Sequence, residues 1–221
     1  METIQKAMHR LFAFHLISLV VILLFASLAH AAPVAPDKVL QAVTTDVITS
    51  LRQDPTQAQD PAKLAALVET RVVPVFDFSR MTQLAMGKSW RLASSAQQEQ
   101  LTAEFKALLI RTYSLALAQY RDQPITYKPL RLVRGDTDTT VRSEVKHGSR
   151  VFRIDYEMTS TPEGWKVYDV KLDAISLVTS FRGGFAAKIR DAGVDGLIRA
   201  LTEKNREDAT SARAVRTVTA L

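Results

Sequence analysis

The chain has 221 residues, of which 47% are hydrophobic and 24% charged, a composition typical of globular proteins. Because it has no cysteine, disulfides, thiolate metal sites, cysteine nucleophiles and lipid anchoring through an N-terminal cysteine are excluded. The formal net charge of +6 favours anionic partners, but the basic residues are scattered along the chain among acidic ones without a dense cluster, so the indication of a nucleic-acid-binding surface is weak.

Residues 1–31 have the three parts of a secretory signal peptide. Lys6 and Arg10 precede a long apolar stretch, and small residues lead to an expected cleavage point after Ala31. With Glu2 this segment carries a net charge of +1, so the mature chain would keep +5 of the +6. An uncleaved membrane anchor is the alternative, since the stretch is just long enough to span a bilayer. Either way, the remaining chain is expected outside the cytoplasm.

Helical periodicity dominates the first half of the mature chain. Asp60 followed by Pro61 is a helix start signal, and Ser94 and Ser95 each precede a glutamine by three residues, as in a capping box. The last of these helices can run to about Tyr120. Helices are therefore expected to begin near residues 36, 61, 79 and 95.

The hydrophobic pattern then changes to a period of two, which predicts antiparallel strands with one apolar and one polar face. Four strands are expected, at 125–133, 139–147, 150–158 and 164–172. Helix is expected again over 176–190, ending at Gly193, with a final helix capped by Asp195. The fold class is therefore α+β, with helices packed on one face of a curved, about four-stranded antiparallel sheet.

Side chains with catalytic potential are sparse. His147 is the one histidine of the mature chain, and its position at a hairpin turn predicts an ordinary surface residue. Pairs of carboxylates such as Asp155 with Glu157 fall on polar strand faces, where solvation explains them. No phosphate-binding glycine loop is present. We therefore expect no enzyme activity, no metal and no cofactor.

Apolar side chains are abundant by contrast, and they allow two interpretations. Aromatic and aliphatic residues crowd the segment 76–90, the long helix, the apolar strand faces and a stripe over 177–185. They could fill a plain core or line an apolar cavity, and periodicity alone does not separate the two.

Four stretches, taken together, resemble the MlaC family, also called toluene-tolerance or ABC-transporter auxiliary periplasmic proteins. They run over 74–90, 105–120, 164–185 and 193–205. The most specific is the run from Gly164 to Val170 followed by Ile175 to Val178. Ala174 departs from the pattern, because glycine is usual there. The resemblance implies a domain over 32–205, followed by a polar tail over 206–221 that we expect to be disordered.

The resemblance further implies a periplasmic phospholipid carrier that maintains outer-membrane lipid asymmetry and acts as a monomer. Its phospholipid cargo would be buried between sheet and helices. It would exchange this lipid with an inner-membrane ABC transporter carrying an MCE-domain ring and with an outer-membrane lipoprotein–porin complex. An enzyme on a similar scaffold and a periplasmic chaperone are the alternatives.

A lipid cavity would be lined by the apolar faces of the third and fourth strands and by the helices packed on them. Alternation gives the strand candidates, and helical spacing gives the others. The candidate lining residues are Phe76, Met81, Leu84, Tyr113, Ile154, Tyr156, Val167, Leu177, Val178 and Phe181.

Overall fold

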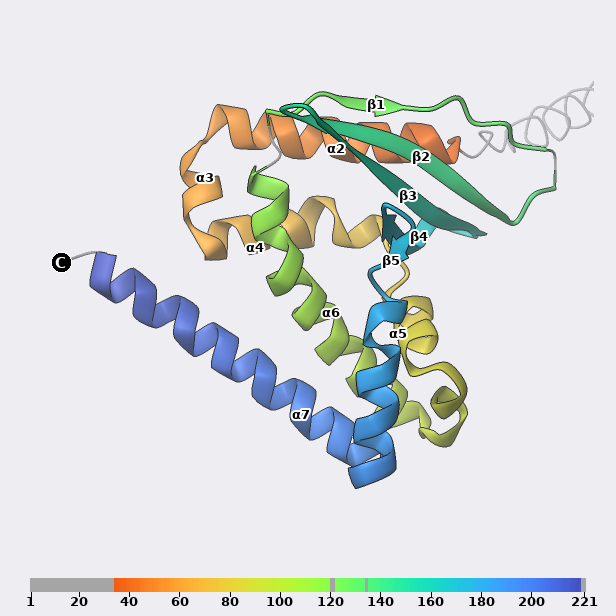
Figure 1. Cartoon of the computed structure of the whole chain (residues 1–221), viewed down its shortest axis with the longest axis vertical. Coiled ribbons are helices and arrows are strands. Elements are labelled where there is room, and N and C mark those ends of the chain that lie inside the picture. Colours follow the sequence, from red (N-terminus) through yellow and green to blue (C-terminus); the bar gives the residue numbers. More distant parts are fainter. Residues whose placement is uncertain (1–33, 120–121, 134, 220–221) are drawn as a thin grey trace, which may run out of the picture. The chain divides into compact units, whose positions relative to one another are not determined.

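A computed structural model of the chain describes residues 34–119, 122–133 and 135–219, with side chains described except in 115–119 and 211–219 (Figure 1). The expected signal segment, 1–31, lies outside these residues. Residues 34–221 form one compact unit. Its helices are α2 (Pro36–Gln53), α3 (Thr56–Gln59), α4 (Pro61–Arg71), α5 (Phe78–Met86), α6 (Ser95–Gln119) and α7 (Arg182–Thr219), with 3-10 turns η1 (Val73–Val75), η2 (Gly87–Leu92) and η3 (Thr179–Phe181).

Local side-chain bonds fix where the helices begin. The Asp60 carboxylate accepts hydrogen bonds from the first free backbone N–H groups of α4, and Pro61 occupies a position that needs no donor. At α6 the predicted capping box is confirmed at Ser94: its N–H donates to Gln97 Oε1 at 2.9 Å, and Ser94 Oγ accepts from the Gln97 N–H at 3.3 Å.

The predicted α+β class and antiparallel sheet are confirmed. The sheet has five strands in the order β1-β2-β3-β4-β5, namely β1 (Ile125–Tyr127), β2 (Asp138–His147), β3 (Arg150–Thr161), β4 (Gly164–Leu172) and β5 (Ile175–Ser176). Two predictions were inexact. The first strand ends at Tyr127, close to Pro129, which has no N–H to donate to a ladder. The fifth strand has only two residues, too few for a periodic signal.

A register shift interrupts the pairing of β3 with β4. Glu157 faces Asp169 while the next residue, Met158, faces Val167, so Tyr168 is an extra residue in a β-bulge. Beyond the bulge the alternation of β4 is reversed. Val170 therefore lies on the same sheet face as Val167, although strict alternation would place the two on opposite faces.

The helices α2, α4 and α6 lie on one side of the sheet (Figure 1). Three clusters of buried side chains hold the layers together. One joins α5, α6 and α7 around Phe105, whose ring packs edge-on against Phe181 at a centroid distance of 5.1 Å. A second joins α2 to the sheet around Met158 and Val167, and a third joins α2 to α4 around Leu51 and Leu64.

The C-terminal region differs in part from the sequence prediction. Helix was expected from Ser176, but that residue belongs to β5, a 3-10 turn follows, and α7 begins at Arg182. The expected break at Gly193 is present as a kink with φ 69°. Beyond it α7 continues to Thr219, so helix covers most of the segment, 206–221, for which a disordered tail was expected.

The turn between β4 and β5 has two residues, Asp173 and Ala174, and both have positive φ, 47° and 69°. Such φ values are those of the type I′ turn, which matches the twist of a hairpin. A Cβ atom in this region is crowded against the backbone, so alanine is strained where glycine is not.

We therefore expect Ala174→Gly to raise the free energy of unfolding by about 1 kcal/mol, because the relieved strain exceeds the added flexibility of the unfolded chain. Ala103→Gly, on an exposed position inside α6, is the matched control and should lower it by about 1 kcal/mol. Urea unfolding of both variants measures the difference. If both variants lost the same free energy of unfolding, Ala174 would not be strained.

Candidate functional site

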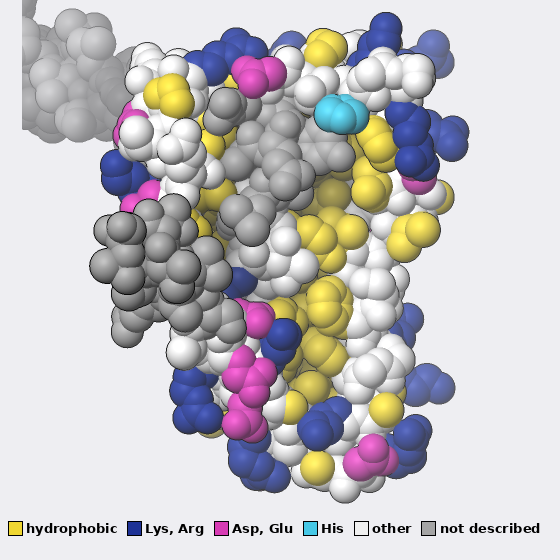
Figure 2. Space-filling view, turned by 60° about the vertical axis from the view of Figure 1, so that its left-hand side comes forward, with side chains coloured by type: hydrophobic (Ala, Val, Ile, Leu, Met, Phe, Trp, Pro, Cys, Tyr) yellow, Lys and Arg dark blue, Asp and Glu magenta, His cyan; other side chains and the backbone are white. Residues whose placement is uncertain are grey.

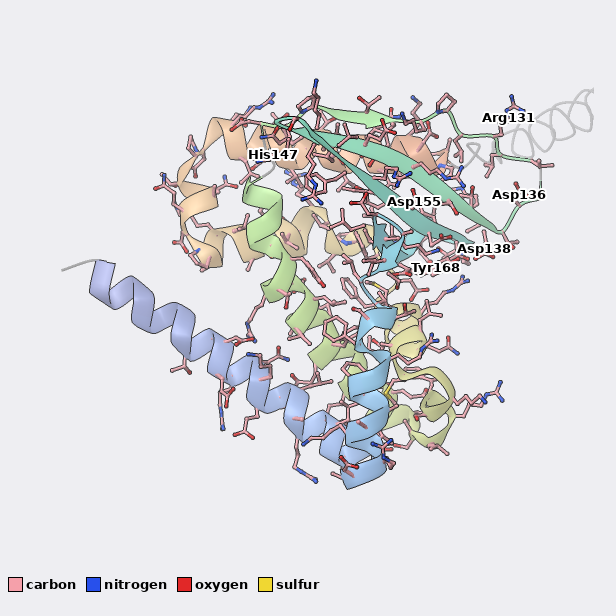
Figure 3. All side chains as sticks on the ribbon, viewed as in Figure 1. Arg131, Asp136, Asp138, His147, Asp155 and Tyr168 are labelled. Carbon is pink, nitrogen blue, oxygen red and sulfur yellow. The ribbon has the colours of Figure 1, made fainter. Side chains whose placement is uncertain are left out.

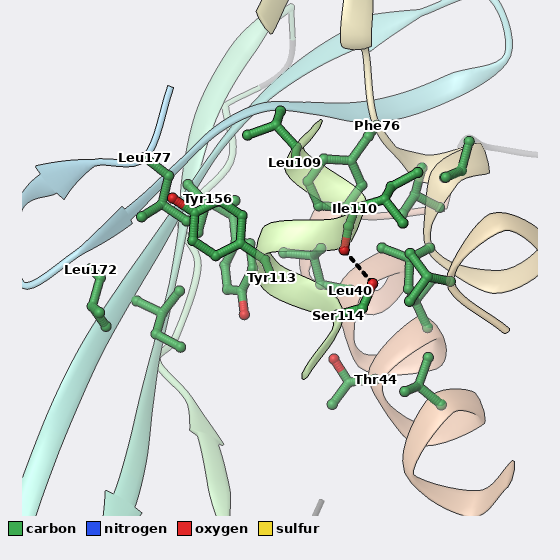
Figure 4. Close-up of a pocket in the computed structure, with 18 of the residues that line it drawn as sticks. Leu40, Thr44, Phe76, Leu109, Ile110, Tyr113, Ser114, Tyr156, Leu172 and Leu177 are labelled. Carbon is green, nitrogen blue, oxygen red and sulfur yellow. Dashed lines mark hydrogen bonds between the residues drawn. The ribbon is translucent and has the colours of Figure 1, made fainter. Parts of the chain in front are cut away.

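A cavity of about 370 Å³ lies between one face of the sheet and the helices that cover it (Figure 4). The helices α2, α4 and α6 form one side, and β1 to β4 form the other. Its lining residues are Leu40, Val43, Thr44, Val47, Ile48, Val68, Val72, Val73, Val75, Phe76, Phe78, Met81, Leu109, Ile110, Tyr113, Ser114, Ile125, Val145, Phe152, Ile154, Tyr156, Val170, Leu172 and Leu177.

The lining carries no charged side chain, and its polar groups are four hydroxyls. Two of them already have partners within the protein. Ser114 donates to the carbonyl oxygen of Ile110, and Thr44 Oγ1 is hydrogen-bonded to Tyr127 Oη at 2.7 Å. The other two hydroxyls belong to Tyr113 and Tyr156, and the Ser143 side chain lies beside that of Tyr156. A lining of this kind suits an apolar ligand, because it provides apolar contact area and few groups that can hydrogen-bond to the ligand.

Tyr156 projects from β3, opposite Val170 on β4 and Val141 on β2. Burial raises its pKa well above the usual value, because a phenolate would lose its hydration there, and the nearby Tyr127 adds to the effect. Burial likewise raises the pKa of Tyr113. Both cavity tyrosines are therefore neutral at physiological pH.

Six of the ten predicted lining residues border the cavity, namely Phe76, Met81, Tyr113, Ile154, Tyr156 and Leu177. The other four, Leu84, Val167, Val178 and Phe181, lie in or against packed clusters. Val167 is fully buried in the cluster that also contains Met158 and Trp165. Val178 is fully buried beside α5 and α6, although its neighbour Leu177 faces the cavity, because the chain turns into η3 at this point.

Sequence reasoning missed eighteen of the twenty-four lining residues, and the cause is clear for two groups among them. The first is a face of α2, comprising Leu40, Val43, Thr44, Val47 and Ile48, whose spacing of three and four residues marks one helical face. This helical spacing is visible in the sequence and could have identified α2 as a wall of the cavity. The second group includes Val170 and Leu172, which regular alternation assigns to the polar face. Only the bulge at Tyr168 brings them to the cavity.

Among the residues that the structure describes, no helix has the length and hydropathy needed to cross a membrane. Within the same residues, no three or more histidine and carboxylate side chains gather as they would around a metal ion.

The fold and the cavity define a class: α+β proteins in which an open antiparallel sheet and its covering helices enclose an apolar cavity. A family model described as MlaC protein matches residues 41–203. The chain therefore belongs to the MlaC family, as its sequence resemblance indicated.

Individual relatives agree with this assignment. The chain is 25% identical to the toluene tolerance protein ttg2D of Pseudomonas putida over 80% of its own length and 83% of the relative's. It is 22% identical to the intermembrane phospholipid transport system binding protein MlaC of Haemophilus influenzae, over 63% and 67%. A phospholipid-binding protein of Ralstonia solanacearum, solved in complex with a phospholipid, has a similar structure with a TM-score of 0.72 and 38% identity, covering 78% of this chain and 98% of that one.

The raised pKa of Tyr156 predicts a pH dependence of stability. Its folded pKa lies above the unfolded value of about 10, so its contribution is complete below about pH 10 and is lost as the pH rises toward the folded pKa. Over that range its share of the loss is about 1.4 kcal/mol per pH unit. Tyr156→Phe should therefore flatten the decline in denaturant-derived stability above pH 10. If stability fell equally steeply with pH in the wild type and in Tyr156→Phe, the raised pKa of Tyr156 would be contradicted.

Proposed function

We propose that this protein binds phospholipid with the acyl chains in the cavity and the headgroup near its opening, and that it carries the lipid between membranes. The observation that supports this best is the uncharged cavity between sheet and helices. It occurs in a chain whose structural neighbour was solved with a phospholipid bound. The transport role is supported by the similarity to a binding protein of an intermembrane phospholipid transport system.

The hydrophobic effect explains why such a carrier is needed. Exposing two acyl chains of about 15 methylenes each to water costs on the order of 24 kcal/mol, at about 0.8 kcal/mol per methylene. Spontaneous transfer through water is therefore negligibly slow. A cavity with an apolar lining replaces the bilayer interior, so that moving a lipid into the protein needs no chemical step and no energy source of its own.

An enzyme on the same scaffold would need an acid, a base or a nucleophile at the cavity. The described lining offers four hydroxyls and neither a carboxylate nor a histidine to activate one of them. Burial also holds Tyr156 in its neutral form. These features favour a carrier over an enzyme.

The proposal places the protein in the periplasm after removal of residues 1–31. There it would exchange phospholipid with an inner-membrane ABC transporter carrying an MCE-domain ring and with an outer-membrane lipoprotein–porin complex, and so maintain lipid asymmetry. Membership of the MlaC family and the export-type N-terminus support this placement.

Filling the cavity tests the binding site. Leu177→Trp should expel phospholipid while the protein stays folded, because the indole takes the volume that the ligand would occupy. Val167→Trp is the matched control, since Val167 is fully buried in a packed cluster. There the added bulk should lower the stability by about 1–3 kcal/mol and leave lipid bound to the folded fraction.

Organic extraction followed by lipid mass spectrometry measures the bound phospholipid, and thermal unfolding measures the stability. A Leu177→Trp protein that melts much earlier and still holds a full complement of phospholipid would contradict the site. Wild-type protein purified without phospholipid would contradict the function itself.

Export is tested separately. N-terminal sequencing of the protein from a periplasmic fraction should begin at Ala32, the residue after the expected cleavage point. Recovery of membrane-bound protein that begins at Met1 would show that the segment is retained as an anchor.

A further inference from the structure

Large apolar side chains are exposed at the end of the sheet that carries the β2–β3 and β4–β5 turns. Leu172, the last residue of β4, lines the cavity and is 40% exposed. Its cross-strand partner on β5, Ile175, is 68% exposed, and Val151 on β3 is 50% exposed. Leu172 and Ile175 thus form an apolar strip that leads from the cavity to the outside of the protein, and Val151 lies at the same end of the sheet on the opposite face of β3.

The exposed hairpin is held in place. Asp173 in its turn accepts a hydrogen bond from the Arg153 N–H at 3.1 Å and donates its own N–H to the Arg153 carbonyl at 2.9 Å. The strained φ of Ala174 is tolerated in the same turn. Because these bonds tie the hairpin to β3, the exposure of Ile175 is a fixed property of the fold.

Basic side chains adjoin this strip. The eight residues 146–153 contain three basic and no acidic side chains. Arg153 is balanced by Asp173, 3.9 Å away, so Lys146 and Arg150 supply the excess positive charge. The Arg150 guanidinium lies over the ring of Phe152, a lining residue, at 5.0 Å.

The views of the surface agree with this distribution. Figure 2 shows hydrophobic side chains next to the histidine of the described residues, His147, with Lys and Arg side chains along the adjacent edge. Figure 3 places His147 at one end of the sheet and Asp138 and Tyr168 toward the other. The basic and apolar groups therefore share the end of the sheet at which Leu172 brings the cavity lining to the surface.

We propose that this docking end, formed by Lys146, Arg150, Val151, Leu172 and Ile175, rests on an anionic phospholipid surface while lipid is exchanged. The proposal builds on the carrier function above. Lys146 and Arg150 contact lipid phosphates, and Ile175 and Leu172 enter the boundary between headgroups and acyl chains. An acyl chain then moves from bilayer to cavity along an apolar path and avoids water.

Site-specific labelling tests the contact directly, and the lack of cysteine in the chain allows a single label. The chain from Ala32 onward, which contains every described residue, would carry Ile175→Cys with a polarity-sensitive fluorophore. Leu92→Cys is the control, because Leu92 on η2 has a similar exposure, 72% against 68% for Ile175, and lies outside the docking end.

Vesicles of phosphatidylcholine mixed with phosphatidylglycerol should shift the emission of the label at 175 to the blue and leave the label at 92 unchanged. Pure phosphatidylcholine vesicles and high salt should weaken the shift, because the attraction is electrostatic in part. No shift at 175, or equal shifts at both positions, would overturn the proposal.

Substitutions by glutamate test how much Ile175 and Arg150 contribute to vesicle binding. Ile175→Glu and Arg150→Glu should each reduce co-sedimentation with phosphatidylglycerol vesicles by about tenfold. Leu92→Glu and Arg91→Glu, which make the same changes on η2, should not. Circular dichroism verifies that each variant is folded. Unchanged co-sedimentation of the first two variants would mean that this end does not dock on lipid, and that a protein partner is the better candidate.

Extracted phospholipid, measured on the same samples, separates this proposal from the carrier function. If the wild-type protein contains phospholipid and the Ile175→Glu and Arg150→Glu variants still bind vesicles, only the docking end is refuted. Absence of bound phospholipid from the wild-type protein refutes the carrier function.

Discussion

The register shift between β3 and β4 determines how the apolar face of the sheet is used. Without the extra residue at Tyr168, strict alternation would direct Val170 and Leu172 to the outer face and place the Lys171 side chain over the helices. With it, one continuous face carries Val167 in a packed cluster and Val170 in the cavity lining. An uncharged cavity next to a solid core depends on this single bulge.

The packed clusters keep the cavity from collapsing. The aromatic group around Phe105 joins α5, α6 and α7, and Leu51 and Leu64 join α2 to α4. Both clusters leave the middle of α2 and the C-terminal half of α6 to line the cavity, and they do not fill the space between these helices and the sheet. The helices are thus fixed at their contacts with one another, and the gap that they span remains available to a ligand.

Sequence patterns predicted much of this arrangement. Period-two alternation located β2, β3 and β4, the capping box located the start of α6, and the resemblance of several ordered motifs indicated the family. The site was harder to predict, because Leu177 and Val178 are adjacent residues with opposite roles, and Val167 shares its face with lining residues yet lies in the core. A bulge and a 3-10 turn decide these cases, and neither has a reliable signature in one sequence.

The hydroxyls of Thr44 and Ser114 are bonded within the protein, which has a thermodynamic consequence for any cargo. A lining with few free donors or acceptors holds its ligand through contact area, so affinity should grow with each methylene and depend little on unsaturation or rotation of the chain. Binding should show a negative heat-capacity change, and its enthalpy should become more favourable as temperature rises.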